Sequence, residues 1–434
     1  MTPEPVIWDG GVPVLDAQAF TLPCGLEVIV HEDHLVPLCA VWVGYRVGSS
    51  DEGDGTSGFA HLFEHMFKNS VHLAGRHHYE VLREAGATDA NAQTGTDRTL
   101  YHEIMPRAAL DTALWIEADR MGYFLPALDD QRLAKQQQVV QAERRQRYEN
   151  APYGPERFAV AEALYPDGHP LRYLTIGRHE DIAAATQARV EQFYRTWYVP
   201  ANATMVLAGD VTRAEAEALC ERWFGSFPSS RRPARRAWAQ PAIAGPVRLE
   251  VTDPLAALVR VRRAWHGPAT HTLDDVALDV LALALATPGT GRLWRALVYE
   301  RSLAQRVSVY VQSGRLGGEF HVIADLRAGS AVAEAEKVID EVMAGVMSGN
   351  GVGLEDRDIG RAVRRREAGL LWRLDGLGRR AALICGAQLA TGVPQVAEEL
   401  MRYLAMDVAT VRAAAGRWLG TEQMVEVVTR AGRA

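Results

Sequence analysis

The end of each half of the chain carries the same local pattern, and this repetition limits the folds that the chain can adopt. In the first half, a helical pattern from Val190 to Trp197 leads into the apolar run MVLAGD. In the second half, a helical pattern from Val411 to Trp418 leads into the run MVEVVT. A helix, a turn and a strand that recur in the same order are typical of a duplicated unit. We therefore expect two related halves.

Alternation of apolar and polar residues marks strands in both halves, with helical patterns between them. The strands expected in the first half are residues 25–33, 37–48, 87–94, 99–106 and 203–211. The pattern then restarts with strands at residues 247–253, 257–265, 306–314 and 318–326. The expected fold class is α+β, with two homologous α/β sandwich domains. Each domain is one copy of a duplicated half-fold, and each has an antiparallel-rich sheet with helices on one face.

A stretch rich in Pro, Ser and Arg lies between the two halves. It covers residues 227–246 and is typical of an interdomain linker, because these residues favour turns and irregular backbone. We expect an N-terminal domain at residues 1–226 and a homologous C-terminal domain at residues 247–434, of which only the first carries a helix face with two His and a Glu. A chain of 434 residues is long enough for two or three domains.

The charge balance gives no sign of a nucleic-acid partner. The chain has a formal net charge of −7, whereas nucleic-acid-binding domains are usually strongly basic. Two basic runs occur, at residues 231–236 and 361–369. We interpret the first as part of the linker and the second as one face of a helix. No nucleic acid is therefore expected among the partners.

The cysteines and the apolar stretches indicate a cytoplasmic protein without a membrane span. The four cysteines are isolated, which is typical of buried thiols in a reducing compartment and argues against a cysteine metal site. Residues 1–10 have neither the basic start nor the apolar run of a secretory signal. The longest uncharged stretch, residues 381–397, is broken by Gly and Pro and is too short to cross a bilayer.

The stretch GFAHLFEHMFKNS, residues 58–70, combines a helical pattern with side chains that suit a metal site. The pair Thr56–Ser57 is well suited to cap its N-terminus. The apolar residues recur at helical spacing on one face, while His61, Glu64 and His65 share the opposite face. The order H-x-x-E-H is the reverse of the commoner zinc-protease motif, in which Glu directly follows the first His.

The polar face of this helix has the composition of a zinc site. Two imidazoles one turn apart can hold a zinc ion and leave room for a third protein ligand and a water molecule. A carboxylate that lies too far round the helix to be a ligand can accept a proton from that water. The alternative is a solvated polar face with no metal. The motif in its helical context favours one zinc ion per chain.

A third protein ligand must come from farther along the chain, and spacing leaves more than one candidate. The helical pattern at residues 129–150 has an inward-facing row that recurs every three or four residues and reaches Glu143. A buried acid needs a cation or hydrogen bonds. Spacing alone leaves two possibilities for Glu143, a zinc ligand or an ion pair with Arg144 or Arg147 at the helix end. The candidate acids are Glu103, Glu117, Asp119, Glu143 and Glu149.

Three stretches resemble the pitrilysin and insulinase family of zinc peptidases, in the form of the mitochondrial processing peptidases and their bacterial relatives. They are GTSGFAHLFEHMFKNS, AGATDANAQTGTDRTLYHE and AERRQRYENAPYG, and the likeness extends over essentially the whole chain. The combination of H-x-x-E-H with a Glu about eighty residues later is highly specific. By this resemblance His61, His65 and Glu143 bind zinc, and Glu64 is the general base.

The resemblance also implies where a peptide substrate binds. In the family, a strand with the pattern N-A-x-T is the edge to which the peptide adds as a further strand through backbone hydrogen bonds. The matching residues here are Asn91, Ala92 and Thr94. Without the resemblance, these residues would be an anonymous strand or turn.

The second half departs from the family pattern at two positions. Active single-chain members carry L-R-x-x-x-x-L-x-Y there, in which the Arg and the Tyr hold carbonyl groups of the bound peptide. The matching stretch LVYERSLAQ has Val298 at the Arg position and Gln305 at the Tyr position, and neither can replace the missing group. This loss resembles the zinc-bearing member of a bacterial subunit pair, whose partner keeps both residues. A further departure is Gln136, where some relatives have an acid; we expect it to tune metal affinity.

The sequence and the resemblance together predict a zinc-dependent endopeptidase that hydrolyses peptides or unfolded segments. Its expected partners are a peptide substrate and a second family subunit, or a second copy of this chain, with no membrane partner. Two alternatives remain. One is a non-catalytic structural or assembly subunit, which would have no chemical reason to keep the motif and the later Glu. The other is a protease dedicated to the leader of one modified peptide.

Overall fold

Each of the two compact units of the protein is built from three separate segments of the chain. Unit 1 contains Met1–Gln141, Leu174–Arg236 and Leu370–Glu398, and unit 2 contains Ala142–Tyr173, Ala237–Gly369 and Glu399–Ala434. The structure, a computed structural model, describes residues 6–9, 12–68, 70–73, 75–349, 353–394 and 396–432. Residues 1–5 and 10, on which the expectation about a secretory signal partly rests, lie outside the described residues.

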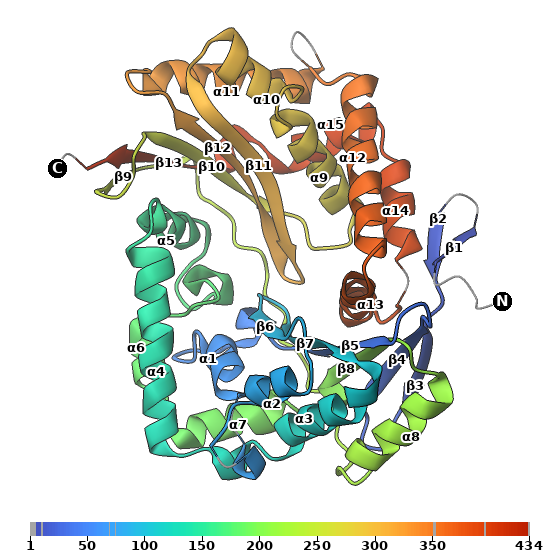
Figure 1. The fold of residues 1–434 in the computed structure, drawn as a ribbon. Coiled ribbons are helices and arrows are strands. Elements are labelled where there is room, and N and C mark those ends of the chain that lie inside the picture. The colour runs from blue at the N-terminus through green and yellow to red at the C-terminus, as the bar shows by residue number, and fades with distance from the viewer. Residues whose placement is uncertain are drawn as a thin grey trace. The chain divides into compact units, whose positions relative to one another are not determined.

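The described residues of unit 1 form a six-stranded sheet and a separate two-stranded sheet (Figure 1). The strands are β1 (Val6–Asp9), β2 (Val12–Leu15), β3 (Gln18–Thr21), β4 (Glu27–Glu32), β5 (Leu38–Tyr45), β6 (Asn91–Thr94), β7 (Thr99–Pro106) and β8 (Ala203–Gly209). The larger sheet has the order β3-β4-β8-β5-β7-β6. β4 and β8 run parallel, and the other neighbouring strands of this sheet are antiparallel.

The sheet of unit 2 repeats this arrangement. Its strands are β9 (Val247–Asp253), β10 (Arg260–Gly267), β11 (Ala304–Gly314), β12 (Gly317–Leu326) and β13 (Val425–Ala431), in the order β11-β12-β10-β13-β9. β13 and β9 run parallel, and the other pairs are antiparallel. The strands β4, β8, β5, β7 and β6 therefore correspond to β9, β13, β10, β12 and β11. The common order and directions confirm the α+β fold class and its duplication.

Helices connect the strands in both units (Figure 1). Those in unit 1 are α1 (Phe59–Met66), α2 (His78–Glu84), α3 (Leu110–Gly122), α6 (His179–Ala183), α7 (Gln187–Trp197), α8 (Arg213–Phe224) and α13 (Leu377–Thr391), with most of α4 (Asp130–Arg144). Those in unit 2 are α5 (Gly154–Leu164), α9 (Leu273–Ala286), α10 (Arg292–Trp294), α11 (Val332–Ser348) and α15 (Val408–Trp418), with most of α12 (Asp356–Leu374) and α14 (Ala397–Leu404).

A helix from the second half of the chain covers one face of the large sheet in unit 1. This helix, α13, packs on β5 and β8. It approaches closely at Gly44, where a Cβ atom would lie only 2.4 Å from Leu389 Cδ1, so a larger residue would displace this side chain. The next side chain, Tyr45, points to the other face because side chains alternate along a strand. On that face its ring lies 4.9 Å from the ring of Tyr198, beside α7.

A helix from the first half of the chain has the same role in unit 2. This helix, α5, packs on β9, β10 and β13, with Val160 and Leu164 against Ala264 and Val427. The opposite face of the sheet packs against α9, α11 and α15 in a larger apolar core. The sequence predicted helices on one face of each sheet. The structure adds one helix to the second face of each sheet, supplied by the other half of the chain.

The core beneath α1 is aromatic. Phe59, Phe63 and Phe67 are buried, with at most 1% of each residue exposed. The ring of Phe63 stacks on that of Tyr198 at a centroid distance of 4.8 Å, and Phe67 meets the same ring edge-on at 4.8 Å. Burial of one such side chain contributes about 1.5–3 kcal/mol to the free energy of folding. This core confirms the predicted apolar face of the helix and orients the polar face.

Several smaller expectations also find an answer in the fold. Residues 227–246 contain no helix or strand, and β9 begins directly after them. The four cysteines are buried and free, as their isolated spacing predicted. Across the described parts of the chain, no helix combines the length and the apolar character that a bilayer crossing needs.

Candidate metal centre

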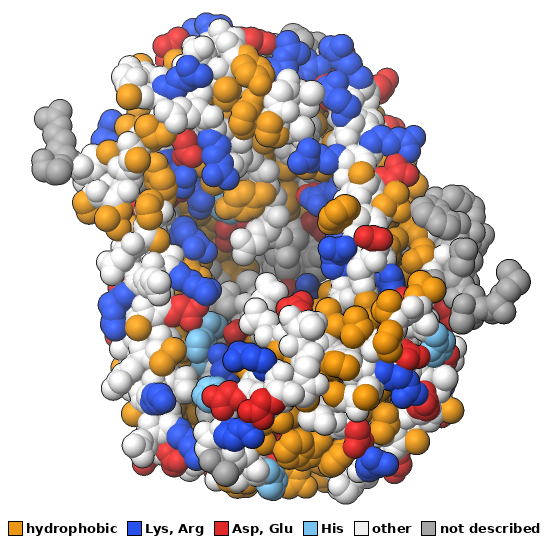
Figure 2. All heavy atoms as spheres, in the orientation of Figure 1, with side chains coloured by type: hydrophobic (Ala, Val, Ile, Leu, Met, Phe, Trp, Pro, Cys, Tyr) orange, Lys and Arg blue, Asp and Glu red, His pale blue; other side chains and the backbone are white. Residues whose placement is uncertain are grey.

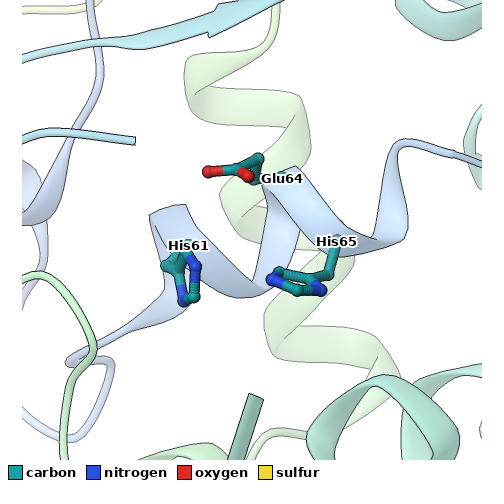
Figure 3. A group of neighbouring side chains, drawn as sticks. All are labelled: His61, Glu64 and His65. Atoms are coloured by element: carbon teal, nitrogen blue, oxygen red, sulfur yellow. The ribbon is translucent and has the colours of Figure 1, made fainter. Parts of the chain in front are cut away.

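Helix α1 brings the three residues of the predicted motif together. One ligand atom from each of His61, Glu64 and His65 lies within 4.8 Å of the others, and within the described residues this is the one such group of His, Cys, Asp and Glu. The two imidazole centroids are 4.8 Å apart, with the ring planes at 81°. Figure 3 shows both rings on one side of the helix and the carboxylate of Glu64 on another. His61 is buried, while Glu64 and His65 are partly exposed.

The N-terminus of α1 is held by Glu52. Its carboxylate oxygens accept hydrogen bonds from the backbone N–H groups of Gly58 and Ala60, both at 2.8 Å. Burial raises the pKa of Glu52 well above its ordinary value, although these two hydrogen bonds act in the opposite direction. The predicted cap at Thr56–Ser57 was wrong: Gly58 occupies the cap position with a left-handed φ of 85°, and Ser57 Oγ donates to Asp181 instead. No local spacing rule links Glu52 to this helix, so the contact could not be predicted from the sequence.

The C-terminal end of α1 rests on a buried His–Asp pair. The ring of His78 is hydrogen-bonded through Nδ1 to the carbonyl oxygen of Phe67 and through Nε2 to Asp119 Oδ2, both at 3.0 Å. Burial raises the pKa of Asp119, but hydrogen bonds from His78, Ser70 and His72 outweigh this effect and hold the pKa below its ordinary value. These residues are far apart in sequence, and no sequence motif predicted their contacts. Side chains from outside α1 therefore hold both of its ends.

The predicted substrate strand lies beside α1. It is β6, and the hydroxyl of its last residue, Thr94, donates to Glu64 Oε2 at 2.7 Å. β6 ends the sheet order, so in the sheet as described only one of its edges is paired, with β7. Asn91 is exposed and Ala92 is half-buried. The structure thus gives the segment 91–94 the character of an edge strand and joins it to the metal motif through Thr94.

Three of the candidate third ligands lie in the interior of unit 1, outside the group formed by His61, Glu64 and His65. Glu103 and Glu117 are fully buried, and burial raises the pKa of each carboxyl group. Glu117 Oε1 lies 3.1 Å from Arg120 Nη2, and the guanidinium of Arg120 lies 4.2 Å above the ring of Tyr101. Asp119 belongs to the His–Asp pair described above. None of the three is a member of the metal-type group on α1.

Glu143 lies in the last turn of α4, in the part of that helix that belongs to unit 2. Its side chain is 17% exposed, and its Oε1 lies 3.0 Å from Arg147 Nη1, which is one of the ion pairs that spacing had left open. Glu149, the remaining candidate, pairs with Arg144 at 2.9 Å. The inward row before Glu143 is confirmed, since Leu133, Gln136 and Val140 are buried. The role of Glu143 as a zinc ligand stays a prediction.

The two departures from the family pattern lie in unit 2. Val298 is part of the apolar core, within a π-helical turn at Arg295–Glu300. Gln305 is exposed near the start of β11. The valine has no hydrogen-bond donor, and a glutamine side chain is shorter than a tyrosine. Within this chain, these positions cannot supply the Arg and Tyr groups that the family pattern contains.

Two family models match successive parts of the chain. The model described as Insulinase (Peptidase family M16) matches residues 27–165, which contain both H-x-x-E-H and Glu143. The model described as Peptidase M16 inactive domain matches residues 184–364. The chain belongs to the M16 peptidase family, that of pitrilysin and insulinase. The M16 assignment thus agrees with the duplicated fold, in which one copy carries the motif.

Individual relatives support the same assignment, and a solved structure shows the same fold. Zinc protease PqqE of Helicobacter pylori is 30% identical over 293 residues, which are 67% of this chain and 65% of that protein, slightly under two-thirds. The probable mitochondrial-processing peptidase subunit beta of Arabidopsis thaliana is 24% identical over 424 residues, covering 93% of this chain and 76% of the relative. A crystal structure of a protease from Helicobacter pylori has a TM-score of 0.87 at 24% identity, over 96% of this chain and 99% of that one, and shows the common fold.

Proposed function

We propose that this M16 protein is a zinc-dependent endopeptidase and the zinc-bearing subunit of a pair. The observation that carries the proposal is the group of His61, Glu64 and His65 on α1, with Thr94 hydrogen-bonded to the carboxylate. In this proposal His61, His65 and Glu143 bind one zinc ion, and Glu64 is the general base. The relative named zinc protease PqqE is consistent with it.

The donor set on α1 suits zinc. Zinc in proteins is bound mainly by imidazole, thiolate and carboxylate groups, and a catalytic site has three protein ligands and one open position. The rings of His61 and His65 lie one helical turn apart, with centroids at 4.8 Å, so both could bind the same ion. A carboxylate such as that of Glu143 would complete the set. When bound, zinc lowers the pKa of a coordinated water to about 7 and polarises a peptide carbonyl group.

The contribution of the chain itself to the reaction is a fixed base. Thr94 Oγ1 donates to Glu64 Oε2 at 2.7 Å, and this contact limits the rotation of the carboxylate. A carboxylate that is already oriented accepts a proton from the attacking water with little reorganisation. The same group then returns the proton to the leaving amine when the peptide bond breaks. Thr94 thus acts as a positioning residue for Glu64.

The free edge of β6 offers a binding place for the substrate. An extended peptide can add to such an edge as a further strand, held by main-chain hydrogen bonds. In the proposal this strand is Asn91, Ala92 and Thr94, which is next to the carboxylate of Glu64 through the Thr94 hydroxyl. Backbone recognition depends little on side chains but requires an extended chain. The proposed substrates are therefore peptides or unfolded segments.

The second subunit is proposed because this chain lacks two hydrogen-bond donors of the family pattern. Val298 is buried in a core and Gln305 carries an amide, so neither provides a guanidinium or a phenol. The Arabidopsis relative is itself named as a subunit. We propose that a family member with Arg and Tyr at the corresponding positions supplies both groups to the bound peptide.

The test is cleavage of unstructured peptides by the purified, zinc-loaded chain, alone and mixed with a family subunit that carries the Arg and the Tyr. Glu64→Gln is the control, because the amide keeps the shape of the side chain but does not accept the proton. We expect turnover that this substitution reduces by about 10²- to 10⁴-fold, with one zinc retained per chain. Near-normal activity of the Glu64→Gln protein would refute the assignment of the base. No turnover in either mixture would favour a structural subunit.

The third ligand has its own test, by metal competition with a chromogenic chelator. Loss of a group that only supports a ligand lowers metal affinity by about 10- to 100-fold, so we expect Glu143→Gln to lower it by more. Glu149→Gln is the matched control, since Glu149 also ends this helical segment and pairs with an arginine. Unchanged affinity in Glu143→Gln would remove this residue from the site; the search would then turn to Glu149 if Glu149→Gln lowers the affinity, and to Glu117 if it does not.

A further inference from the structure

A concave site lies in unit 2, between β11, α9 and α12. Its volume is about 500 Å³, which is within the usual range for ligand pockets. One wall is apolar and includes Leu283, Ala286 and Val307. Arg306 from β11 and Arg365 from α12 line another part, and both side chains are exposed. The pocket thus combines an apolar surface with two guanidinium groups.

One of the two charges in this pocket, that of Arg365, comes from the basic run that the sequence pattern assigned to a helix face. Three of its arginines are paired: Arg361 with Asp358, Arg364 with Glu367 at 2.7 Å, and Arg366 with Asp279. Arg365 has no acidic partner within the described part of the chain. Figure 2 shows basic side chains gathered around α12, in the upper half of the view. All four arginines are exposed, as a solvated helix face predicts, and Arg365 differs from the other three because no acid among the described residues balances its charge.

Arg306, like Arg365, has no acidic partner among the described residues. Its Nε donates to Ser308 Oγ at 3.2 Å. Two positively charged groups that line one pocket repel each other, and an anion between them removes this repulsion. A planar guanidinium matches the geometry of a carboxylate, with which it forms strong charge-assisted hydrogen bonds.

We propose that this pocket binds a carboxylate attached to an apolar group, namely the free C-terminus of a peptide that ends in an apolar residue. The two arginines receive the carboxylate, and the wall formed by Leu283, Ala286 and Val307 receives the last side chain. The choice of a peptide as the carrier of the carboxylate rests on the proposed peptidase function. The site gives the protein a preference for peptides with a free, apolar C-terminus over internal segments.

The test is peptide binding by the full-length Glu64→Gln protein in the presence of a chelator, so that neither zinc nor cleavage affects the result. Fluorescence anisotropy compares an N-terminally labelled, unstructured peptide that ends in Leu with the same peptide as its C-terminal amide. We expect the amide to bind about tenfold more weakly or worse, because it loses charge-assisted hydrogen bonds. The difference should shrink at high salt, since both arginines are exposed.

Two variants locate the effect. Replacing both pocket arginines, Arg306→Gln with Arg365→Gln, should make the acid and the amide bind equally. Arg364→Gln removes one charge from the same helix outside the pocket and should keep the preference for the acid. Two results would overturn the proposal. One is equal binding of the acid and the amide by the Glu64→Gln protein with both arginines present, and the other is a preference for the acid that survives the double arginine substitution.

A third arm distinguishes the sources of a carboxylate. If octanoate binds through the two arginines and the peptide acid does not, the pocket is a carboxylate site but the peptide assignment is wrong. Failure of the proposed function has a separate signature, because it appears as absent turnover by the zinc-loaded parent protein. Binding by the metal-free Glu64→Gln protein does not depend on turnover, so the two outcomes are independent.

Discussion

Helices α1 and α9 occupy equivalent positions in two sheets of the same topology, yet their polar residues differ in use. Along the chain, α1 follows β5 and precedes β6. In the same way, α9 follows β10 and precedes β11, which are the corresponding strands. α1 has two histidines and a glutamate grouped within 4.8 Å. α9 contains no histidine, and each of its acids has a partner in unit 2: Asp274 with Arg417, Asp275 with Ser313, and Asp279 with Tyr403.

The difference between the two helices lies in their side chains and not in the path of the backbone. A shared fold positions a helix, but chemistry requires particular groups on it. In α9 the acids hold the helix to neighbouring elements, whereas in α1 this task falls to Glu52, His78 and Asp119, which lie outside the helix. The residues that hold the ends of α1 therefore lie outside its polar face. The description of the second family model as an inactive domain agrees with this contrast.

The largest expected effect is the loss of zinc when the two histidines that distinguish α1 from α9 are replaced. The double substitution His61→Asn with His65→Asn should reduce zinc content from one ion per chain to none, because the two imidazoles are replaced by weak ligands. Metal analysis of the dialysed protein measures this directly. A variant that still holds one tightly bound zinc ion would show that the site lies elsewhere, and unit 2 would then have to be searched.

The next effect compares the cores beneath the two helices. Phe63→Ala removes a fully buried ring from the inner face of α1 and should lower the free energy of unfolding by about 3–5 kcal/mol. Leu281→Ala is the matched change under α9 and should cost about 2–5 kcal/mol. Urea unfolding measures both. Only Phe63→Ala should also weaken zinc binding; an equal loss of zinc affinity in Leu281→Ala would contradict the separation of the two sites.

A smaller effect concerns Thr94 as a positioning residue. Thr94→Val keeps the shape of the side chain but removes the hydrogen bond to Glu64, which should lower kcat by about 10- to 100-fold, since hydrogen bonds to charged groups contribute about 1.5–3 kcal/mol. KM should change little, because β6 binds the peptide through its backbone. Thr94→Ser restores the hydroxyl and should recover most of kcat. If the serine variant is as slow as the valine variant, the hydroxyl has no such role.

The smallest expected effect is a difference in acid sensitivity centred on unit 2. Burial, together with the neighbouring His266, lowers the pKa of His169 to about 4. In the unfolded chain this imidazole takes up a proton near pH 6.5, so stability is full above that pH and falls as the pH drops from 6.5 toward 4. We expect a loss of about 1–2 kcal/mol, seen as faster hydrogen exchange in α5, whose neighbour Tyr165 stacks on His169 at 4.7 Å.

His169→Gln is the control for this pH effect. It removes the titrating group, so hydrogen exchange in α5 should then respond less to pH. An identical pH response in the parent and the variant would assign the sensitivity to another group, such as His266, whose pKa burial also lowers.

The sequence predicted the fold class because its signals are local and repeated. Alternation marked the strands, and the recurrence of helix, turn and strand pointed to duplication. It did not reveal that α5 and α13 each cover the sheet of the unit formed mainly by the other half. Periodicity shows that a helix has a buried face, but it does not show which surface buries it.

The candidate site divides in the same way. Helical spacing was enough to place His61, Glu64 and His65 together, since neighbours at three and four positions share a face. The groups that hold the helix, Glu52 and the pair His78–Asp119, depend on tertiary contacts and gave no signal. The hydrogen bond from Thr94 to Glu64 is of the same kind: the resemblance pointed to the strand, but only the structure shows this contact.

The location of α13 determines when unit 1 can be completed during synthesis. All strands of its sheet have been made once residue 209 has left the ribosome, but the helix that packs on Gly44 ends only at residue 391. Until then, the β5 and β8 face that this helix covers stays open in the nascent chain. We expect this half-made protein to attract chaperones, because an uncovered apolar sheet face is prone to aggregation. A gene truncated within residues 227–246 would make that exposure permanent.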